Sequence, residues 1–304
     1  MKLAGGADRG SPWCGRWSPA FRSPYDRRVS CDAEAPIGIF DSGFGGLTVA
    51  RAIVNQLPGE DIIYLGDTAR APYGEKSIAD VRKYALACLD VLVDMGVKAL
   101  VIACNTASAA VLADARERYR VPVVEVIQPA VQRAVRVSRH GHVAVLCTQA
   151  TATSKAYDDA MAAAVGVDLT TAVCSRFVDF VEAGITGGDE LLEVAETYLR
   201  PIRESQADTV ILGCTHYPLL SGVISYVLGD DMTLVSSAEE CGNATYAMLA
   251  REGLLREGNQ GHRRFLTTGN PQRFALIAAR LLGDFVGSAE TDKKMSYEQV
   301  RVDT

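Results

Sequence analysis

A chain of 304 residues is long enough for one large α/β unit or for two domains of ordinary size. Two domains are the better expectation, because a single hydrophobic core seldom grows large enough to hold a chain of this length. Hydrophobic residues make up 48% of the chain and charged residues 22%, which is the balance of a globular protein with a substantial core. The formal net charge of -6 gives no basic surface for a phosphate backbone, which excludes nucleic acid as the expected substrate.

The eight cysteines are scattered along the chain, with no C-x-x-C pair and no regular Cys/His spacing, so we expect no metal site. Several lie in apolar runs, where a free thiol packs as a small hydrophobe, and this usage suits a reducing cytoplasm. No run approaches the roughly 18–20 apolar residues that span a bilayer, and the N-terminus lacks the apolar segment of a secretion signal. We therefore expect a cytoplasmic protein without membrane contact.

Both ends of the chain have the composition of tails. Residues 1–34 are rich in Gly, Ser, Pro and Arg and show no apolar periodicity, which predicts a flexible N-terminal tail. Residues 286–304 lack a clear pattern as well, and we expect them to form a C-terminal tail.

Between the tails, short apolar segments alternate with longer helical patterns. This alternation predicts an α/β fold with parallel-rich sheets flanked by helices. Two helices are expected at 77–95, opened by Ser77, and at 189–205, where Pro201 predicts a late kink or break. The expected strands lie at 37–40, 61–67, 98–104, 121–126, 142–148, 168–174, 209–214 and 232–237.

A weak internal repeat organises the chain. Residues 100–106 (LVIACNT) resemble residues 210–216 (VILGCTH), because each is an apolar strand that runs into a cysteine and then into small polar residues. Strands at 37–41 and 143–148 precede the two copies at similar separations. We predict two similar domains related by pseudo-symmetry. The first comprises 35–128 plus 236–285, and the second comprises 129–235.

Cys104 and Cys214 occupy the corresponding position in the two copies. In parallel α/β sheets, ligands gather beyond the carboxyl ends of strands, where the chain enters a helix. Asn105, Thr106 and Ser108 are residue types that cap such a helix, so we expect one of them to cap the helix after Cys104.

Two thiols at this edge can perform a proton exchange. Helix N-termini and nearby histidines lower a thiol pKa from about 8.5, and His216 lies two residues after Cys214. If the thiols face opposite sides of a bound α-carbon, one removes its proton as thiolate and the other returns a proton to the opposite face. The configuration is then inverted. The alternative is that both cysteines are inert core residues, which is our interpretation of Cys88, Cys147, Cys174 and Cys241.

Four motifs in order extend this interpretation to a known family. They are 41–49 (DSGFGGLTV), 66–67 (GD) followed by 71–75 (APYGE), 103–108 (ACNTAS) and 213–219 (GCTHYPL). From about residue 36 to about residue 283 the chain resembles glutamate racemase, a member of the aspartate/glutamate racemase superfamily. The resemblance implies two α/β domains with the active site between them. It also implies a homodimer that uses neither pyridoxal phosphate nor a metal nor any other cofactor.

The same resemblance implies a reaction and a set of site residues. The reaction is interconversion of L- and D-glutamate, a small-molecule substrate, which supplies D-glutamate for peptidoglycan synthesis and thereby serves cell wall biogenesis and cell shape. Cys104 would act on D-glutamate with help from Asp41, and Cys214 on L-glutamate with help from His216. The implied substrate-binding residues are Asp41, Ser42, Pro72, Tyr73, Gly74, Asn105, Thr106, Thr148, Thr151, Glu182, Thr215 and His216.

Four details of the match need comment. Asp41 and Ser42 are also residue types that cap the helix of a strand-to-helix turn. Cys147 stands where the resembled family has glycine, which leaves the backbone before Thr148 open. Glu182 matches a family acid near the substrate amine, and an exposed helical glutamate explains it equally well. The glycines of 43–48 fail the dinucleotide pattern G-x-G-x-x-G, so we expect them to form a tight turn near a small ligand.

Two other functions compete with glutamate racemisation. The first is another two-cysteine racemase of the superfamily, acting on aspartate or a hydantoin. The second is an interaction protein, since some glutamate racemases are considered to bind DNA gyrase and residues 1–34 offer a contact segment.

Overall fold

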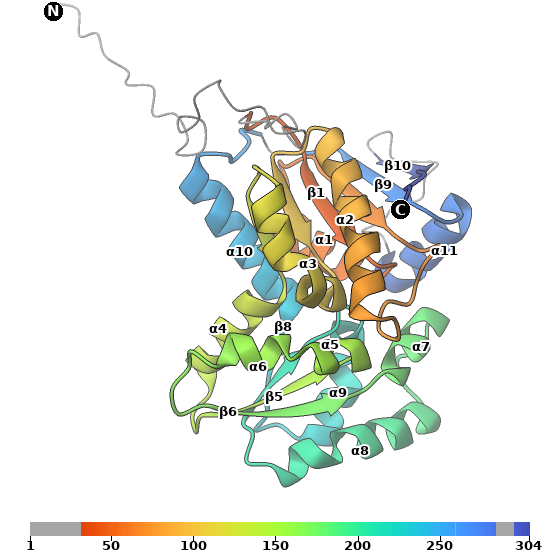
Figure 1. Ribbon diagram of the computed structural model, residues 1–304. Helices are drawn as coiled ribbons and strands as arrows, with labels where there is room; N and C mark the ends of the chain where they lie inside the picture. Colours follow the sequence, from red (N-terminus) through yellow and green to blue (C-terminus); the bar gives the residue numbers. More distant parts are fainter. Residues whose placement is uncertain (1–31, 259, 284–294) are drawn as a thin grey trace, which may run out of the picture.

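The computed structural model describes residues 32–258, 260–283 and 295–304, so most of the predicted N-terminal tail lies outside the described residues. Two parallel sheets carry the fold (Figure 1). The first has the order β10-β9-β2-β1-β3-β4 and the second β6-β5-β7-β8. The strands are β1 (Ile37–Asp41), β2 (Ile62–Gly66), β3 (Ala99–Ile102), β4 (Val123–Glu125), β5 (His142–Cys147), β6 (Asp168–Val173), β7 (Thr209–Leu212), β8 (Thr233–Ser236), β9 (Arg263–Thr267) and β10 (Met295–Gln299).

Helices flank both sheets and connect most of the strands, as the alternating pattern predicts. None of those described is both long and apolar enough to cross a membrane. The helices are α1 (Leu47–Gln56), α2 (Ile78–Asp94), α3 (Asn105–Arg118), α4 (Ile127–Val137), α5 (Gln149–Ser154), α6 (Ala156–Met161), α7 (Arg176–Ala183), α8 (Asp189–Glu204), the 3-10 helix η1 (Tyr217–Leu220), α9 (Ser221–Leu228), α10 (Ser237–Glu252) and α11 (Pro271–Leu282).

Both helices foreseen in detail are present. α2 begins after Ser77, whose hydroxyl accepts a hydrogen bond from Asp80 N at 3.1 Å, so the predicted opening residue is confirmed. α8 runs through Pro201 and ends at Glu204. Proline removes only one backbone donor, and so close to the end of a helix the remaining turn completes without a break.

The order of strands reveals the internal repeat. In the first sheet β2-β1-β3-β4 are neighbours, and in the second β6-β5-β7-β8 are neighbours in the same arrangement. β3 and β7 therefore correspond, and so do β1 and β5. The predicted fold of two similar parallel modules is confirmed, and the two repeated cysteines follow equivalent strands. The residue limits of the two domains stay a prediction.

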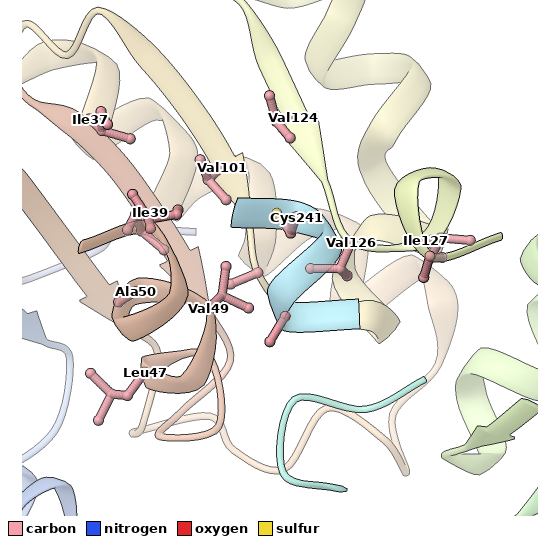
Figure 2. Packing of buried hydrophobic residues seen from close by; sticks show 14 of the residues in the cluster. Ile37, Ile39, Leu47, Val49, Ala50, Val101, Val124, Val126, Ile127 and Cys241 are labelled. Carbon is pink, nitrogen blue, oxygen red and sulfur yellow. The ribbon is translucent and has the colours of Figure 1, made fainter. Parts of the chain in front are cut away.

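The core of the first module is built on both faces of its sheet. Every residue of β1 is buried, and alternate side chains face opposite layers. Ile37 and Ile39 belong to the buried cluster on the side of α1 and α10, to which Val49 and Cys241 contribute from those helices (Figure 2). Phe40 packs in the other layer, against α2 and α3. α10 follows the last strand of the second sheet yet packs on α1, so the chain returns to the first module there.

The C-terminal end of the chain differs from the predicted tail. Part of 286–304, expected as a tail, forms β10 and pairs in parallel with β9. The Tyr297 ring stacks on Phe265 with centroids 5.3 Å apart, and an arginine–glutamate pair joins the two strands. A single aromatic residue within a polar run gives no period-2 apolar signal, which explains why the sequence suggested a tail. β9 itself was also missed, since it opens on two arginines.

The last residues of the predicted N-terminal tail are bound as well. Lys98, which is fully buried beside Glu60, donates from Nζ to the carbonyl of Ala33. Arg256 Nε lies 2.8 Å from a carboxylate oxygen of Glu34. Residues 32–34 therefore belong to the folded first module and not to a tail.

Candidate active site

Loops from both modules line one pocket. Its walls come from the residues that follow β1, β2 and β3 in the first sheet and β5, β6 and β7 in the second. All of these are carboxyl ends of parallel strands, which is where ligands bind in such sheets. The pocket is lined by Ser42, Gly43, Ala71, Pro72, Tyr73, Gly74, Glu75, Cys104, Asn105, Thr106, Thr148, Ser175, Val178, Asp179, Glu182, Cys214, Thr215 and His216.

Most residues singled out in the sequence meet in this pocket. Two do not line it: Asp41 and Thr151 are buried, and each contacts residues of the lining. Gly43 lines the pocket too, where the glycines of 43–48 were expected to approach a small ligand. Five lining residues were missed, namely Ala71, Glu75, Ser175, Val178 and Asp179. The last three precede Glu182 by seven, four and three positions, so they share one face of α7 with it. Helical spacing counted back from Glu182 is the signal that finds them.

Cys104 caps the helix that follows it. Its Sγ accepts a hydrogen bond from Ala107 N at 3.4 Å, so the prediction that one of the polar residues behind it would cap α3 is wrong. The reason is that the extended backbone of Cys104 already places its sulfur over the free N–H groups. Burial raises the pKa of Cys104 to about 12, and the nearby Asp41 carboxylate adds to this, while Ser42 and Ala107 oppose it. Cys104 is therefore a proton-carrying thiol at neutral pH.

Asp41 lies buried at the end of β1. Its Oδ2 accepts from Gly43 N at 2.8 Å, and its Oδ1 has no hydrogen-bond partner among the described residues. It does not cap α1, which begins after Gly46 without a side-chain cap. Burial raises the pKa of Asp41, and the charge of His216 opposes that rise. The unpaired oxygen is a buried hydrogen-bond acceptor directly behind the pocket lining.

Cys214 belongs to a chain of three side chains. Its Sγ lies 3.7 Å from His216 Nδ1, and His216 Nε2 lies 3.2 Å from Glu182 Oε1. Burial lowers the pKa of His216, but its hydrogen bonds to Cys214 and Glu182 outweigh burial and raise the pKa to about 10. His216 is therefore an imidazolium at neutral pH, and this cation lies beside the Cys214 sulfur. Glu182 is partly buried and paired, not a free surface glutamate.

Three threonine hydroxyls join the modules beside the pocket. Thr106 Oγ1, on α3, lies 3.0 Å from Thr148 Oγ1 and 3.1 Å from Thr151 Oγ1, both of the second module. The two partners lie 3.1 Å from each other. β5 runs regularly through Cys147, whose side chain is buried, so this cysteine leaves Thr148 in the pocket.

Glycine lets the two modules approach each other closely. A Cβ on Gly45 would lie 2.3 Å from Thr215 Oγ1 and 2.5 Å from His216 Nδ1, and both distances are too short for a real contact. A Cβ on Gly74 would lie 3.0 Å from the Cβ of Thr148. The glycines of 43–48 were expected to form a tight turn near a small ligand. At Gly45 the close neighbour is the second cysteine loop.

The amide of Asn105 is oriented by the second module. Tyr157 donates from its hydroxyl to Asn105 Oδ1 at 2.7 Å. The opposite end of the amide, Nδ2, is buried and has no hydrogen-bond partner among the described residues. Because Asn105 lines the pocket, this free donor is available to an acceptor such as a carboxylate oxygen.

Replacing Tyr157 with phenylalanine tests this orientation. We expect KM for the substrate to rise about tenfold with kcat nearly unchanged, because the amide loses the hydrogen bond that fixes it and roughly 1–1.5 kcal/mol of binding with it. Steady-state kinetics check the result. Tyr226→Phe, at an exposed tyrosine of α9, is the matched control. Equal KM values for both variants and the unaltered chain would contradict the assignment.

Charge in the pocket is uneven. Neither lysine nor arginine occurs among its described lining residues, and His216 is the single cationic group there. Neutral hydroxyl and amide groups surround it, and these groups bind carboxylates without a formal charge. Within the described part of the chain, no three His, Cys, Asp or Glu residues are grouped so as to hold a metal ion.

The fold and the pocket define a class of protein: two α/β modules of one topology, each of which presents a thiol to the same pocket. Comparison with known families agrees with this class. The model of the Asp/Glu/Hydantoin racemase family matches residues 37–239, and the chain belongs to that family. Its relatives include the glutamate racemase of a Parafrankia species, 63% identical over 252 residues that cover 82% of this chain and 91% of the relative. The glutamate racemase of Acidothermus cellulolyticus is 59% identical over 258 residues, covering 84% and 98%.

Solved structures give the same result. A glutamate racemase from Bacillus anthracis superposes with a TM-score of 0.81 at 38% identity, covering 83% of this chain and 95% of that one. A glutamate racemase from Francisella tularensis, solved in complex with D-glutamate, has a TM-score of 0.79 at 33% identity and covers 89% and 98%. The resemblance inferred from four motifs is thus confirmed.

Proposed function

We propose that this racemase interconverts L- and D-glutamate through Cys104 and Cys214, without a cofactor. One observation carries the proposal: the two thiols follow equivalent strands of two pseudo-symmetric modules and line the same pocket. A substrate held between the modules exposes opposite faces of its α-carbon to them, which is the arrangement that inversion requires. The glutamate racemases named above support the choice of glutamate.

The proton held by Cys104 suits the reaction from L-glutamate. Cys214 is the base in that direction: with the His216 imidazolium beside it, its sulfur removes the α-proton and becomes a thiol. The α-carbon is left as a planar carbanion, and the Cys104 thiol then donates its own proton to the opposite face. D-glutamate forms and Cys104 remains as a thiolate. In the reverse direction Cys104 is the base, and Asp41, which lies close to it, assists there.

Substrate binding follows from the polar groups of the pocket. The unpaired Asn105 Nδ2 and the hydroxyls of Thr106, Thr148 and Thr215 bind carboxylate oxygens. Asp41 lies behind the pocket lining, so its unpaired Oδ1 reaches the substrate ammonium only if the neighbouring loop shifts on binding. Ser42, Pro72, Tyr73 and Gly74 close the side of the pocket that the first module supplies, and Thr151 supports the threonine contact from behind.

Substrate profiling tests the choice of glutamate. Purified protein without added cofactor should convert L-glutamate to the racemate, followed by circular dichroism, and should turn over L-aspartate and a hydantoin far more slowly. Brisk aspartate turnover with an inert glutamate would replace this function by that of another two-cysteine racemase.

The cellular role extends this proposal. D-glutamate made by this reaction would supply peptidoglycan synthesis and so serve cell wall biogenesis. A cytoplasmic location agrees with the described cysteines, which are all free, buried thiols. The homodimer implied by the resemblance stays a prediction.

A further inference from the structure

A single arginine connects the C-terminal segment to a wall of the pocket. Arg70 Nη2 donates to the carbonyl oxygen of Val302 at 2.7 Å, and Nη1 donates to Asp67 Oδ1 at 2.9 Å. The guanidinium lies over the ring of Tyr84 on α2, with its carbon 5.1 Å from the ring centroid. The fork of an arginine can serve two acceptors at once, which a point charge such as lysine does less well.

Asp67 links Arg70 to Tyr73, a residue of the pocket lining. Its carboxylate is fully buried, and its Oδ2 accepts from the hydroxyl of Tyr73 at 2.6 Å. Thr268 Oγ1, from the loop after β9, donates to Oδ1 at 2.7 Å. The backbone N–H of Asp67 also donates to the carbonyl of Asp41 at 2.9 Å. A buried carboxylate with these partners holds them in a fixed arrangement, because losing one leaves a charge poorly compensated.

The loop positioned in this way, residues 71–75, lies at the substrate. All five of its residues line the pocket, and Tyr73 is almost completely buried. The carbonyl of Gly74 accepts from Ala150 N at 3.0 Å, so the loop also meets the second module. A displacement of this loop therefore changes the shape of the pocket and the fit between the modules.

The C-terminal segment is anchored by its own packing. β10 pairs with β9, and the N–H of Val300 donates to the carbonyl of Thr267 at 3.0 Å. The side chain of Val302 is 8% exposed and packs in the apolar layer that contains α2 and α3. Its carbonyl is thus presented to Arg70 from a fixed backbone.

We propose that Arg70 and the segment 295–302 form a latch that positions the substrate loop 71–75. Arg70 is a positioning residue: it acts on substrate through Asp67 and Tyr73, and the last strand of the chain completes the active site. The proposal rests on the proposed racemase function for its kinetic consequence, whereas its structural consequence is independent of the substrate.

The latch is tested by releasing either end. Val302→Asp places a charge in the apolar layer and detaches the segment, Arg70→Ala removes the bridge, and Arg70→Lys keeps the charge but not the fork. Arg301→Ala, at an exposed neighbour of Val302, is the matched control. Each full-length protein is assayed with L- and D-glutamate, and hydrogen exchange is followed in peptides covering 67–76.

We expect the three latch variants to raise KM for both enantiomers about tenfold while kcat changes little, the size of effect that loss of a charge-assisted hydrogen bond gives. Backbone amides of 67–76 should exchange faster in these variants and not in Arg301→Ala. The double variant Arg70→Ala/Val302→Asp should raise KM no further than the larger single change, because both remove one connection.

Other outcomes decide against the latch. A lower kcat at unchanged KM is what a smaller folded fraction gives, so the variants would then be merely destabilised and the latch would be overturned. Unchanged exchange in 67–76, additive effects in the double variant, or an equal effect of Arg301→Ala would each overturn it. An unaltered protein that fails to racemise glutamate overturns the proposed function instead, and the exchange measurement still tests the latch.

Discussion

Serine in place of Cys104 or Cys214 is expected to lower the rate of racemisation by about 10²–10⁴-fold, the usual contribution of a positioned acid or base. The hydroxyl has nearly the shape of the thiol but holds its proton too tightly to act as the base. Circular dichroism with each enantiomer as starting material measures the loss. Full activity in either variant would remove that cysteine from the mechanism.

The two variants should also differ in direction. With Cys214 intact, Cys104→Ser can still remove the α-proton of L-glutamate. The rate at which this proton exchanges with deuterated solvent should therefore fall less for the L- than for the D-enantiomer. Cys214→Ser should show the opposite preference. Cys88→Ser replaces a buried thiol of α2 that does not line the pocket and serves as the control. Equal loss of exchange with both enantiomers in both variants would contradict the assignment of one thiol to each face.

Glu182→Gln is expected to move the alkaline limb of the pH profile with L-glutamate to lower pH by about one unit and to lower kcat about tenfold. The Glu182 carboxylate favours the charged form of His216 and so helps to raise the pKa to about 10. Removing that charge lowers the pKa of His216, and the imidazolium is then lost earlier as pH rises. The Cys214 sulfur loses its cationic neighbour over the same range.

The pH dependence of kcat/KM reports this group in the free enzyme. Glu190→Gln, at an exposed glutamate of α8 that pairs with Arg176, is the matched control and should leave the limb in place. An unchanged limb in Glu182→Gln would show that the carboxylate does not act through His216.

Much of the fold was predictable because its signals are local. The eight strands expected from short apolar runs are all present, and Ser77 opens α2 as its residue type suggests. β10 could not be predicted, because it is held by pairing with β9, by the contacts of Tyr297 with two phenylalanine rings and by an arginine–glutamate pair, and none of these leaves a pattern in its own sequence. The capping of α3 by Cys104 was missed for a related reason, since capping depends on backbone conformation.

The site shows the same division between local and distant information. Motifs locate the residues that follow each strand, and most of these reach the pocket. The contacts between modules depend on how two separate sheets meet. The hydrogen bond from Tyr157 to Asn105 and the contact between Thr106 and Thr151 join residues roughly fifty positions apart, and no spacing rule connects them. The link from Glu182 to His216 also exists only once α7 is folded beside η1.

The path of the chain between the modules limits how the pocket can open. The chain crosses from the first sheet to the second between β4 and α4, and it returns between β8 and α10. α4 and α10 pack against each other, so the two crossings are neighbours. A body tethered at two adjacent points keeps one easy degree of freedom, which is rotation about the line through them. Entry of a ligand would then require the two modules to rotate apart about this line, so that the sulfur atoms of Cys104 and Cys214 separate and face the ligand from opposite sides.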